Sequence, residues 1–203
     1  ADVLSVFAGL RPLAAPEKKK KKTKEVSRSH KIIVSETGLI TITGGKWTTY
    51  RKIAEDIVNK AITVHQLPNH KCVTEHLAIH GNNKNTESDF EHHLSIYGTD
   101  RKAILQLQKN QPKLNEKLHP DYDYTLAEVV WAIREEMATT VEDVLARRVR
   151  LLFLDARASI ECSNKVAQLL ADELGHDEAW IKNQLDDFKN VASGFLLKEF
   201  RVL

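Results

Sequence analysis

The chain has 203 residues, which is enough for one large domain or two small ones with a buried core. Its 30 Lys and Arg against 28 Asp and Glu give a formal net charge of +2, which excludes a general electrostatic attraction to nucleic acid or anionic membranes. Aromatic residues make up only 6% of the chain, too few for a base-stacking surface.

Cys72 and Cys162 are the only cysteines and form no CxxC pair, which argues against a disulfide framework or a zinc knuckle and favours a reducing compartment. No stretch approaches the ~20 apolar residues of a membrane span, and no basic region precedes an apolar run as in a signal peptide. The chain begins on Ala1, without Met, in a β-type run. We therefore expect a piece of a longer protein.

The first part of the chain has a β-rich pattern. Residues 3–10 form a β-type run that ends at Arg11-Pro12. Residues 18–24 contain six lysines. Such a block of like charge cannot pack, so it indicates an exposed loop, with contact to anionic lipid head groups as the alternative.

A hairpin and a helix are predicted next. Residues 32–35 and 39–43 are β-branched runs joined by Glu36-Thr37-Gly38, a turn that favours a β-hairpin. After the hairpin, Tyr50, Ile53, Ile57 and Ala61 recur at helical spacing.

Beyond His65 the pattern changes to a polar connector and then to helices. Residues 72–79 of the connector favour a short extended run. The helical part contains an apolar stripe of Phe90, Leu94 and Tyr97, a short helix around residues 100–108, and capping-box patterns at residues 125–128 and 139–142. The second box introduces one long helix with an apolar stripe of Leu145, Val149, Leu152 and Ala156; Gly175 ends the next helix, and residues 176–195 begin the last. The sequence therefore predicts an α+β chain with a β-rich fragment (residues 1–64), a connector (65–85) and an all-helical domain (86–203).

The sequence GGKWTTYRK, residues 44–52, is the strongest candidate for a ligand site. It is not a Walker A loop, because Ile40 stands where the first glycine is needed and Trp47 follows Lys46. None of the eight glycines has GxGxxG spacing either. Two interpretations stay open: a glycine turn that lets backbone approach an anionic ligand at a helix start, or a plain strand-to-helix turn with threonine caps.

Histidines and arginines elsewhere suggest no site. His76 and His80 lie in the run expected to be extended, where residues four apart are separated by ~13 Å, too far to share a metal ion. No EF-hand loop is present, so we expect no metal site. The arginines of residues 145–158 flank an apolar stripe, which indicates a core helix with snorkelling arginines instead of a nucleic-acid arm.

Three segments in order carry a resemblance to a known family: FAGLRPL (residues 7–13), SRSHKIIVSETGLITITGGKWTTYRKIAED (27–56) and TVEDVLARRVRLLFLDARA (140–158). Together they resemble the C-terminal part of FAD-dependent, quinone-reducing glycerol-3-phosphate dehydrogenases, a pattern that related glycerol-3-phosphate oxidases share. The resemblance implies that residues 1–64 are the end of an FAD- and substrate-binding domain, whose GxGxxG would lie upstream. It also implies that the helical domain is the family's C-terminal domain.

The resemblance also implies roles for individual residues. Arg11 and Arg28 match basic residues at the substrate and its phosphate, and a planar guanidinium suits a phosphate. Lys46 matches a lysine on the flavin and substrate side of the glycine turn. Gly45, Trp47 and Thr48 match backbone positions at the flavin pyrimidine edge, although many relatives have an aliphatic residue in place of Trp47. No catalytic residue is assigned.

These matches predict the C-terminal portion of a flavoprotein that oxidises glycerol 3-phosphate to dihydroxyacetone phosphate by hydride transfer to FAD and passes the electrons to quinone. The chain alone is expected to be inactive and not to retain FAD. For the parent protein we expect a cytoplasmic location at the inner face of the cytoplasmic membrane, peripheral membrane association, a homo-oligomer and no binding of nucleic acid. The alternatives are a self-standing helical interaction module, a glycerol-3-phosphate oxidase and an amino-acid oxidase.

Overall fold

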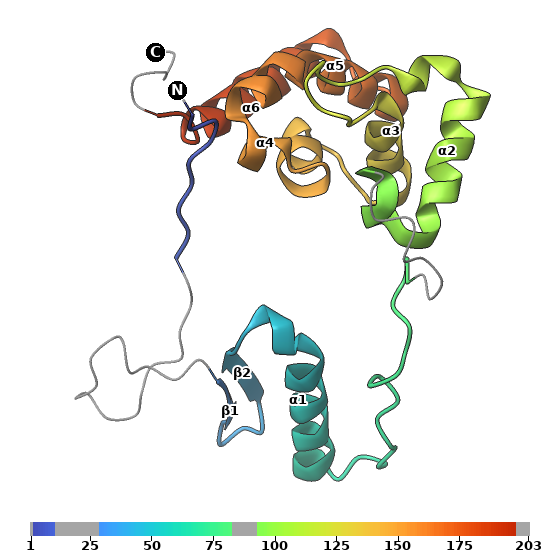
Figure 1. Ribbon diagram of the computed structural model, residues 1–203. Helices are drawn as coiled ribbons and strands as arrows, with labels where there is room; N and C mark the ends of the chain where they lie inside the picture. The colour runs from blue at the N-terminus through green and yellow to red at the C-terminus, as the bar shows by residue number, and fades with distance from the viewer. Residues whose placement is uncertain (1, 11–28, 83–92, 198–203) are drawn as a thin grey trace. The chain divides into compact units, whose positions relative to one another are not determined.

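The computed structural model describes residues 2–10, 29–82 and 93–197 and divides into two compact units (Figure 1). One unit comprises Ala1–Ala8 and His80–Leu203, and the other comprises Gly9–Ile79. Arg11, Arg28, Phe90 and the lysine block at residues 18–24 lie outside the described residues. The α+β prediction is confirmed, with a small antiparallel sheet followed by a helical domain.

The predicted hairpin is confirmed in the second unit. Strands β1 (His30–Val34) and β2 (Ile40–Gly44) pair antiparallel, with Ile32 opposite Ile42. The turn is closed by the Ser35 amide, which donates to the Leu39 carbonyl over 2.9 Å. A single 3-10 turn, η2 (Trp47–Thr49), then leads into helix α1 (Tyr50–His65).

Two polar contacts attach α1 to the hairpin. His30 Nε2 lies 3.0 Å from an Asp56 carboxylate oxygen, and His65 Nε2 lies 3.2 Å from the Gly38 carbonyl. The predicted stripe of Ile53 and Ile57 is half-buried between the helix and the sheet. In the described range 29–82 no residue is fully buried, so this unit has only a thin apolar layer.

Two predicted extended runs are not strands. Residues 72–79 contain a turn at Thr74 and Glu75, so the prediction of an extended run there is wrong. Residues 2–10 are extended, but within the described part of the chain their backbone bonds go to the ends of helices. The Val6 amide donates to the Phe195 carbonyl over 2.8 Å, and the Leu4 carbonyl accepts from the Ala156 amide over 3.2 Å.

The helical unit contains the core of the molecule. Its elements in chain order are η3 (His93–Asp100), α2 (Arg101–Asn110), η4 (Pro112–Asn115), α3 (Leu126–Glu135), the π-helical segment η5 (Asp143–Arg148), α4 (Leu151–Leu154), α5 (Ala156–Leu174) and α6 (Glu178–Ser193). Helix α3 lies at the centre, and seven of its residues are buried. Helices α5 and α6 pack side by side along one face (Figure 1). The predicted helix end at Gly175 is confirmed by its left-handed φ of 75°.

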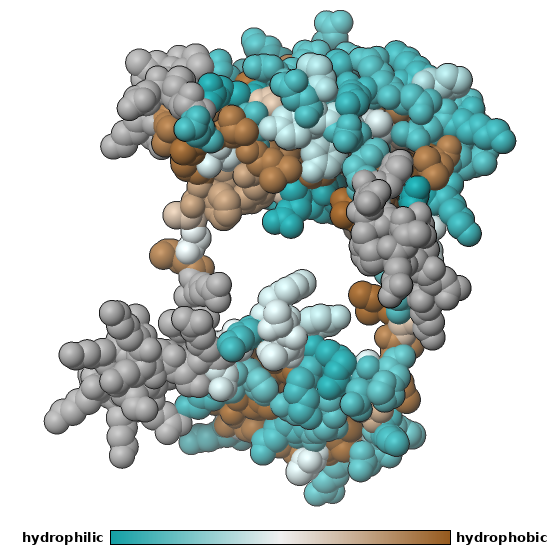
Figure 2. Space-filling view, viewed as in Figure 1, coloured by the Kyte–Doolittle hydropathy of each residue, from teal (hydrophilic) through white to brown (hydrophobic). Residues whose placement is uncertain are grey.

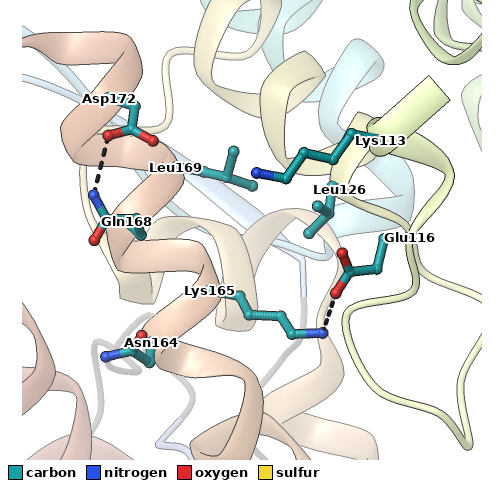
Figure 3. Close-up of a pocket in the computed structure, with 8 residues that line it drawn as sticks. All are labelled: Lys113, Glu116, Leu126, Asn164, Lys165, Gln168, Leu169 and Asp172. Carbon is teal, nitrogen blue, oxygen red and sulfur yellow. Dashed lines mark hydrogen bonds and ion pairs between the residues drawn. The ribbon is translucent and has the colours of Figure 1, made fainter. Parts of the chain in front are cut away.

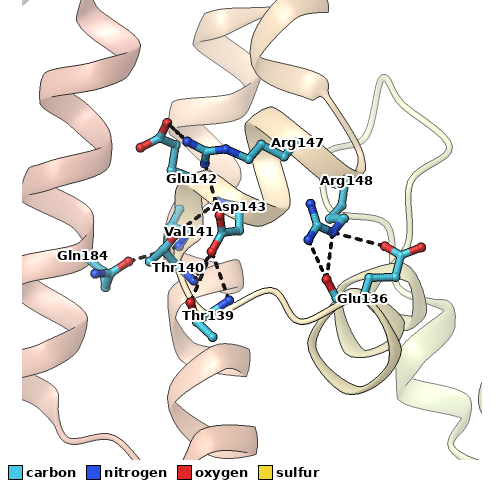
Figure 4. A network of polar contacts seen from close by, with 9 residues as sticks. All are labelled: Glu136, Thr139, Thr140, Val141, Glu142, Asp143, Arg147, Arg148 and Gln184. Atoms are coloured by element: carbon cyan, nitrogen blue, oxygen red, sulfur yellow. Dashed lines mark hydrogen bonds and ion pairs between the residues drawn. The ribbon is translucent and has the colours of Figure 1, made fainter. Parts of the chain in front are cut away.

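The two predicted capping boxes have different outcomes. At α3 the box is confirmed, since the Thr125 amide donates to the Glu128 carboxylate over 2.7 Å. The second box is shifted by one residue, because Asp143 takes the place expected for Glu142 (Figure 4). The Asp143 carboxylate accepts from the Thr140 amide over 3.1 Å, and the Thr140 hydroxyl accepts from the Asp143 amide over 3.0 Å. Glu142 instead pairs with Arg147.

The single long helix predicted after this box is broken. Val149 bonds back to Val144 in a π-type turn, and Arg150 has a left-handed φ of 61°. Asp155 then caps α5 by accepting from the amides of Arg157 and Ala158, each over 3.0 Å. The apolar stripe survives the breaks, because all four of its residues, Leu145, Val149, Leu152 and Ala156, are buried.

Candidate functional site at the Gly44–Gly45 turn

The turn between β2 and α1 depends on two glycines with left-handed backbones. Gly44 has φ 77° and Gly45 has φ 92°, values that favour glycine. A Cβ on Gly45 would lie 2.6 Å from Ile53 Cδ1, on the first turns of α1. Glycine at position 45 therefore lets the turn pack closely against Ile53 of the helix.

Lys46, Trp47 and Thr48 follow this turn and project into solvent. All three are exposed, and the Trp47 side chain is 87% exposed. The Trp47 ring stacks on Tyr50 with centroids 5.7 Å apart. The exposed Trp47 ring beside Lys46 makes this turn a candidate contact surface.

The interpretation of the turn as a plain strand-to-helix turn with threonine caps is not supported, because no threonine side chain caps this helix start. The Thr49 hydroxyl donates to the Lys46 carbonyl over 3.0 Å and does not accept from a helix amide. No side-chain cap bond is made at Lys46 or Thr49 within the described residues. The amides of Thr49 and Tyr50 donate to the Lys46 and Trp47 carbonyls, so the amides that a helix start leaves without intrahelical partners are here the earlier ones, at Trp47 and Thr48. These amides and the Lys46 charge both favour a negatively charged group.

The structure brings together four of the predicted site residues. Gly45, Lys46, Trp47 and Thr48 are consecutive; Gly45 is half-buried against Ile53, and the other three are exposed. Arg11 and Arg28 lie outside the described residues, so their roles remain predictions.

Several of the described histidines are engaged in local polar pairs. His80 is exposed and lies 2.6 Å from an Asp100 oxygen. His93 Nε2 lies 3.2 Å from Glu128, a fully buried carboxylate that Tyr97 also contacts. Burial, together with the Glu128 charge, raises the pKa of Tyr97 well above its usual range. Within the described residues no group of three or more His, Cys, Asp or Glu could hold a metal ion.

A shallow pocket of about 250 Å³ lies on the helical unit between η4 and α5 (Figure 3). Its floor contains Leu126 and Leu169, and its rim carries charged groups that are paired with neighbours. Lys165 Nζ lies 2.6 Å from Glu116, and the Gln168 amide donates to Asp172 over 3.0 Å. No sequence motif marks this pocket, because its residues come from separate helices.

The comparisons with known proteins agree with the ordered motifs. Residues 35–181 match the family model described as the C-terminal domain of alpha-glycerophosphate oxidase. The chain belongs to this family. The matched range includes the glycine turn and most of the helical unit, and it confirms the resemblance expected from the motifs.

Several curated relatives are glycerol-3-phosphate dehydrogenases. A probable mitochondrial glycerol-3-phosphate dehydrogenase of Caenorhabditis elegans is 38% identical and covers 91% of this chain. The mitochondrial enzymes of Rattus norvegicus and Arabidopsis thaliana are 35% and 34% identical and cover 98% and 96% of the chain. The chain spans 28%, 29% and 35% of the lengths of these three relatives.

The relatives correct one prediction. Their names place them in mitochondria, so the predicted cytoplasmic location at the inner face of the cytoplasmic membrane is wrong. The error arose because two unpaired cysteines indicate a reducing compartment in general, and composition does not separate one such compartment from another. No helix in the described parts of the chain combines the length and the apolar character needed to cross a bilayer.

Proposed function

We propose that the chain is the C-terminal part of a longer flavoprotein that oxidises glycerol 3-phosphate to dihydroxyacetone phosphate. The observation that carries the proposal is the GGKWTT turn with its exposed residues Lys46, Trp47 and Thr48, which follows the sequence Arg11-Pro12 and precedes a helical domain in the order of the motifs that carry the resemblance. The family match and the names of the relatives support the same substrate. Those names also support a mitochondrial site of action.

The residues of the turn fit a flavin. Gly44 and Gly45 take left-handed backbones that turn the chain from β2 into the helix start, and the missing Cβ of Gly45 makes room for Ile53. The positive end of the helix dipole at this turn suits the pyrimidine edge, which carries negative charge when a flavin is reduced. We assign Gly45, Lys46, Trp47 and Thr48 to this edge. FAD, when bound, supplies the hydride acceptor at N5.

The substrate is a small dianion, and basic side chains would bind it. We propose that Arg11 and Arg28 bind its phosphate end, where a guanidinium can donate two parallel hydrogen bonds. Lys46 would lie between flavin and substrate and contribute a point charge. In this proposal the electrons pass to quinone. Quinone lies in a membrane, so the parent protein would associate with a membrane surface. We also propose that the parent protein is a homo-oligomer.

The first experiment replaces Lys46 in the full-length protein. Lys46→Ala should raise KM for glycerol 3-phosphate or lower kcat, with an overall loss of about tenfold or more in kcat/KM, because a charge next to the substrate is lost. Lys60→Ala, an exposed lysine on α1, is the matched control and should leave kcat/KM unchanged. Reduction of a quinone analogue follows the reaction, and hydrogen peroxide release identifies an oxidase instead.

Two results would overturn the proposal. One is a full-length protein that contains no flavin or does not oxidise glycerol 3-phosphate. The other is an unchanged kcat/KM in both Lys46→Ala and Lys60→Ala, which would contradict the assignment of Lys46 to the site. Oxidation of an amino acid by the same protein would favour an amino-acid oxidase, in which an arginine binds a carboxylate. A self-standing helical interaction module remains the non-enzymatic alternative, since the buried core is confined to the helical unit among the described residues.

A further inference from the structure

The glycine turn is packed against one side chain of β1 and one of α1. His30 lies opposite Gly44 in the antiparallel strand pair. A Cβ added to Gly45 would lie 3.4 Å from the His30 Cβ and 2.6 Å from the Ile53 Cδ1. The strand and the helix therefore both approach the turn at Gly45, and His30 is the residue that the strand contributes.

A hydrogen bond joins His30 to α1 beside this turn. His30 Nε2 lies 3.0 Å from one Asp56 carboxylate oxygen, and Lys52 Nζ lies 3.0 Å from the other. The Lys52 ammonium holds the pKa of Asp56 below its ordinary value, and His30 adds to this effect. An ionised carboxylate can only accept, so His30 Nε2 carries the proton and donates it. The two side chains are only 23% and 30% exposed, which shields the pair better than an ordinary surface ion pair.

Polar bonds of this kind matter in the unit of the hairpin and α1, because its apolar layer is thin. Polar residues cover most of this unit on the face shown in Figure 2, and none of the described residues 29–82 is fully buried. The His30–Asp56 bond joins strand and helix next to the glycine turn. The His65–Gly38 bond joins them at the opposite end, at the turn of the hairpin. The position of the glycine turn therefore depends on the first bond more than on the second.

The pair acts on the part of the chain that the proposed function assigns to the flavin. The amides of Trp47 and Thr48 and the start of the helix follow directly after Gly45. We infer that His30, bonded to Asp56, is a positioning residue for the glycine turn, and that the pair sets the reduction potential of the flavin through this turn. The inference rests on the proposed function, and all of its residues belong to the unit of the hairpin and α1.

The physical basis is the distance dependence of the helix dipole. A reduced flavin carries negative charge at its pyrimidine edge, and the positive end of a helix stabilises that charge only within about one turn. An oxidised flavin is neutral and gains much less. Loss of the His30–Asp56 bond should therefore weaken the binding of reduced flavin about tenfold more than that of oxidised flavin. For a two-electron couple, this tenfold change lowers the midpoint potential by about 30 mV.

The test breaks each of the two helix–hairpin bonds in the full-length protein. His30→Ala removes the donor, and His30→Gln keeps an N–H donor for Asp56. His65→Ala is the matched control, because it removes the bond to Gly38 at the end of the hairpin away from the glycine turn. Asp56→Ala and the double variant with His30→Ala complete a double-mutant cycle. For each variant, the flavin content and the midpoint potential of the flavin are measured.

The inference predicts a specific pattern of potentials. His30→Ala and Asp56→Ala should each lower the midpoint potential by about 30 mV, and the double variant should lower it no further, because one bond is lost in all three. His30→Gln and His65→Ala should keep the wild-type potential. If His30→Ala retains no flavin, the comparison is made with Asp56→Ala.

Three results would overturn the inference and leave the proposed function standing. These are an unchanged potential in His30→Ala and Asp56→Ala, an equal decrease in His65→Ala, and additive decreases in the double variant. A wild-type protein that contains flavin but does not oxidise glycerol 3-phosphate would overturn the proposed function, while the potentials would still test the pair. A wild-type protein without flavin would overturn both.

Discussion

Gly98 has a backbone conformation that only glycine adopts without strain, and it lies against another part of the backbone. Its φ of 56° and ψ of −123° interrupt η3. A Cβ at this position would lie 1.8 Å from the Gly81 carbonyl oxygen, which already accepts from the Thr99 amide over 3.1 Å. Neither backbone segment has a flexible side chain that could move away. Gly98 therefore fixes how the chain enters the helical unit.

We expect Gly98→Ala to destabilise the helical unit by about 2–4 kcal/mol, because backbone strain and a backbone clash add together. Gly175→Ala is the control, since Gly175 has φ 75° but nothing within 4 Å of an added Cβ. Gly175→Ala should lower the free energy of unfolding by about 1 kcal/mol, because it adds only the strain of a left-handed backbone at an alanine. Urea unfolding followed by far-UV circular dichroism gives both values, and equal losses in the two variants would contradict the argument.

Single residues of the site were partly predictable from sequence. A Gly-Gly pair before a helix indicates close backbone approach, and the structure explains it through the left-handed conformation of Gly44 and Gly45. Whether Thr49 caps the helix could not be predicted, because its hydroxyl can donate to the Lys46 carbonyl equally well. The buried pairing of His93 with Glu128 was also missed, since the capping-box pattern explains Glu128 without it.

At the scale of an element, Asp143 and Thr140 cap the helical turn that leads into η5. Its carboxylate accepts from the amides of Thr139 and Thr140, each over 3.1 Å, and lies 3.2 Å from Arg147 (Figure 4). Burial raises the pKa of Asp143, but the hydrogen bonds from Thr139 and Thr140 and the charge of Arg147 outweigh it. The net effect holds the pKa below its ordinary value. The folded state therefore favours the ionised carboxylate.

Asp143→Ala should cost about 1–2 kcal/mol near neutral pH, because a reciprocal cap is lost. Glu142→Ala should cost about 0.5 kcal/mol or less, since it removes only a surface pair with Arg147. The stabilisation by Asp143 is complete above the unfolded pKa of an aspartate, about 3.9, and is lost as pH falls through the lower folded pKa. Thermal unfolding of wild type and variants from pH 7 to pH 3 measures the difference. A larger loss of unfolding free energy in Glu142→Ala than in Asp143→Ala would favour the capping box predicted at residues 139–142.

Helix positions were easier to predict than helix continuity. Apolar spacing found the buried stripe of residues 145–156, because burial depends on the side-chain pattern. The break inside it was missed, since Arg150 is not a residue type that signals a left-handed backbone. Asp155, in contrast, is a good N-cap residue, and its position before Ala156 could have indicated a new helix start.

At the scale of the whole molecule, segments at both ends of the chain build one unit. Ala1–Ala8 cluster with His80–Leu203, although the sequence groups these first residues with the hairpin. A β-type run indicates an extended chain but does not say whether its backbone bonds go to a strand or to helix ends. The assignment of residues 1–64 to the end of a flavin domain stays a prediction.

The two units should differ sharply in stability when separated. None of the described residues 29–82 is fully buried, and a two-stranded sheet with one helix buries too little apolar surface to offset the entropy of folding. The helical unit, in contrast, has a core that includes Leu94, Val129 and Phe188. We therefore expect a fragment of residues 29–79 to be unfolded and one of residues 80–203 to fold.

Far-UV circular dichroism and thermal unfolding of the two fragments measure this difference. A peptide of residues 1–10 added to the 80–203 fragment should raise its midpoint of unfolding in a saturable way, because it restores the hydrogen bonds of Leu4, Ser5 and Val6 to the helical unit and the ring contact of Phe7 with Phe153. A peptide with Phe7→Ala serves as the control and should raise the midpoint less. A cooperative unfolding transition in the 29–79 fragment alone would show that the hairpin and α1 form a stable domain without a buried core.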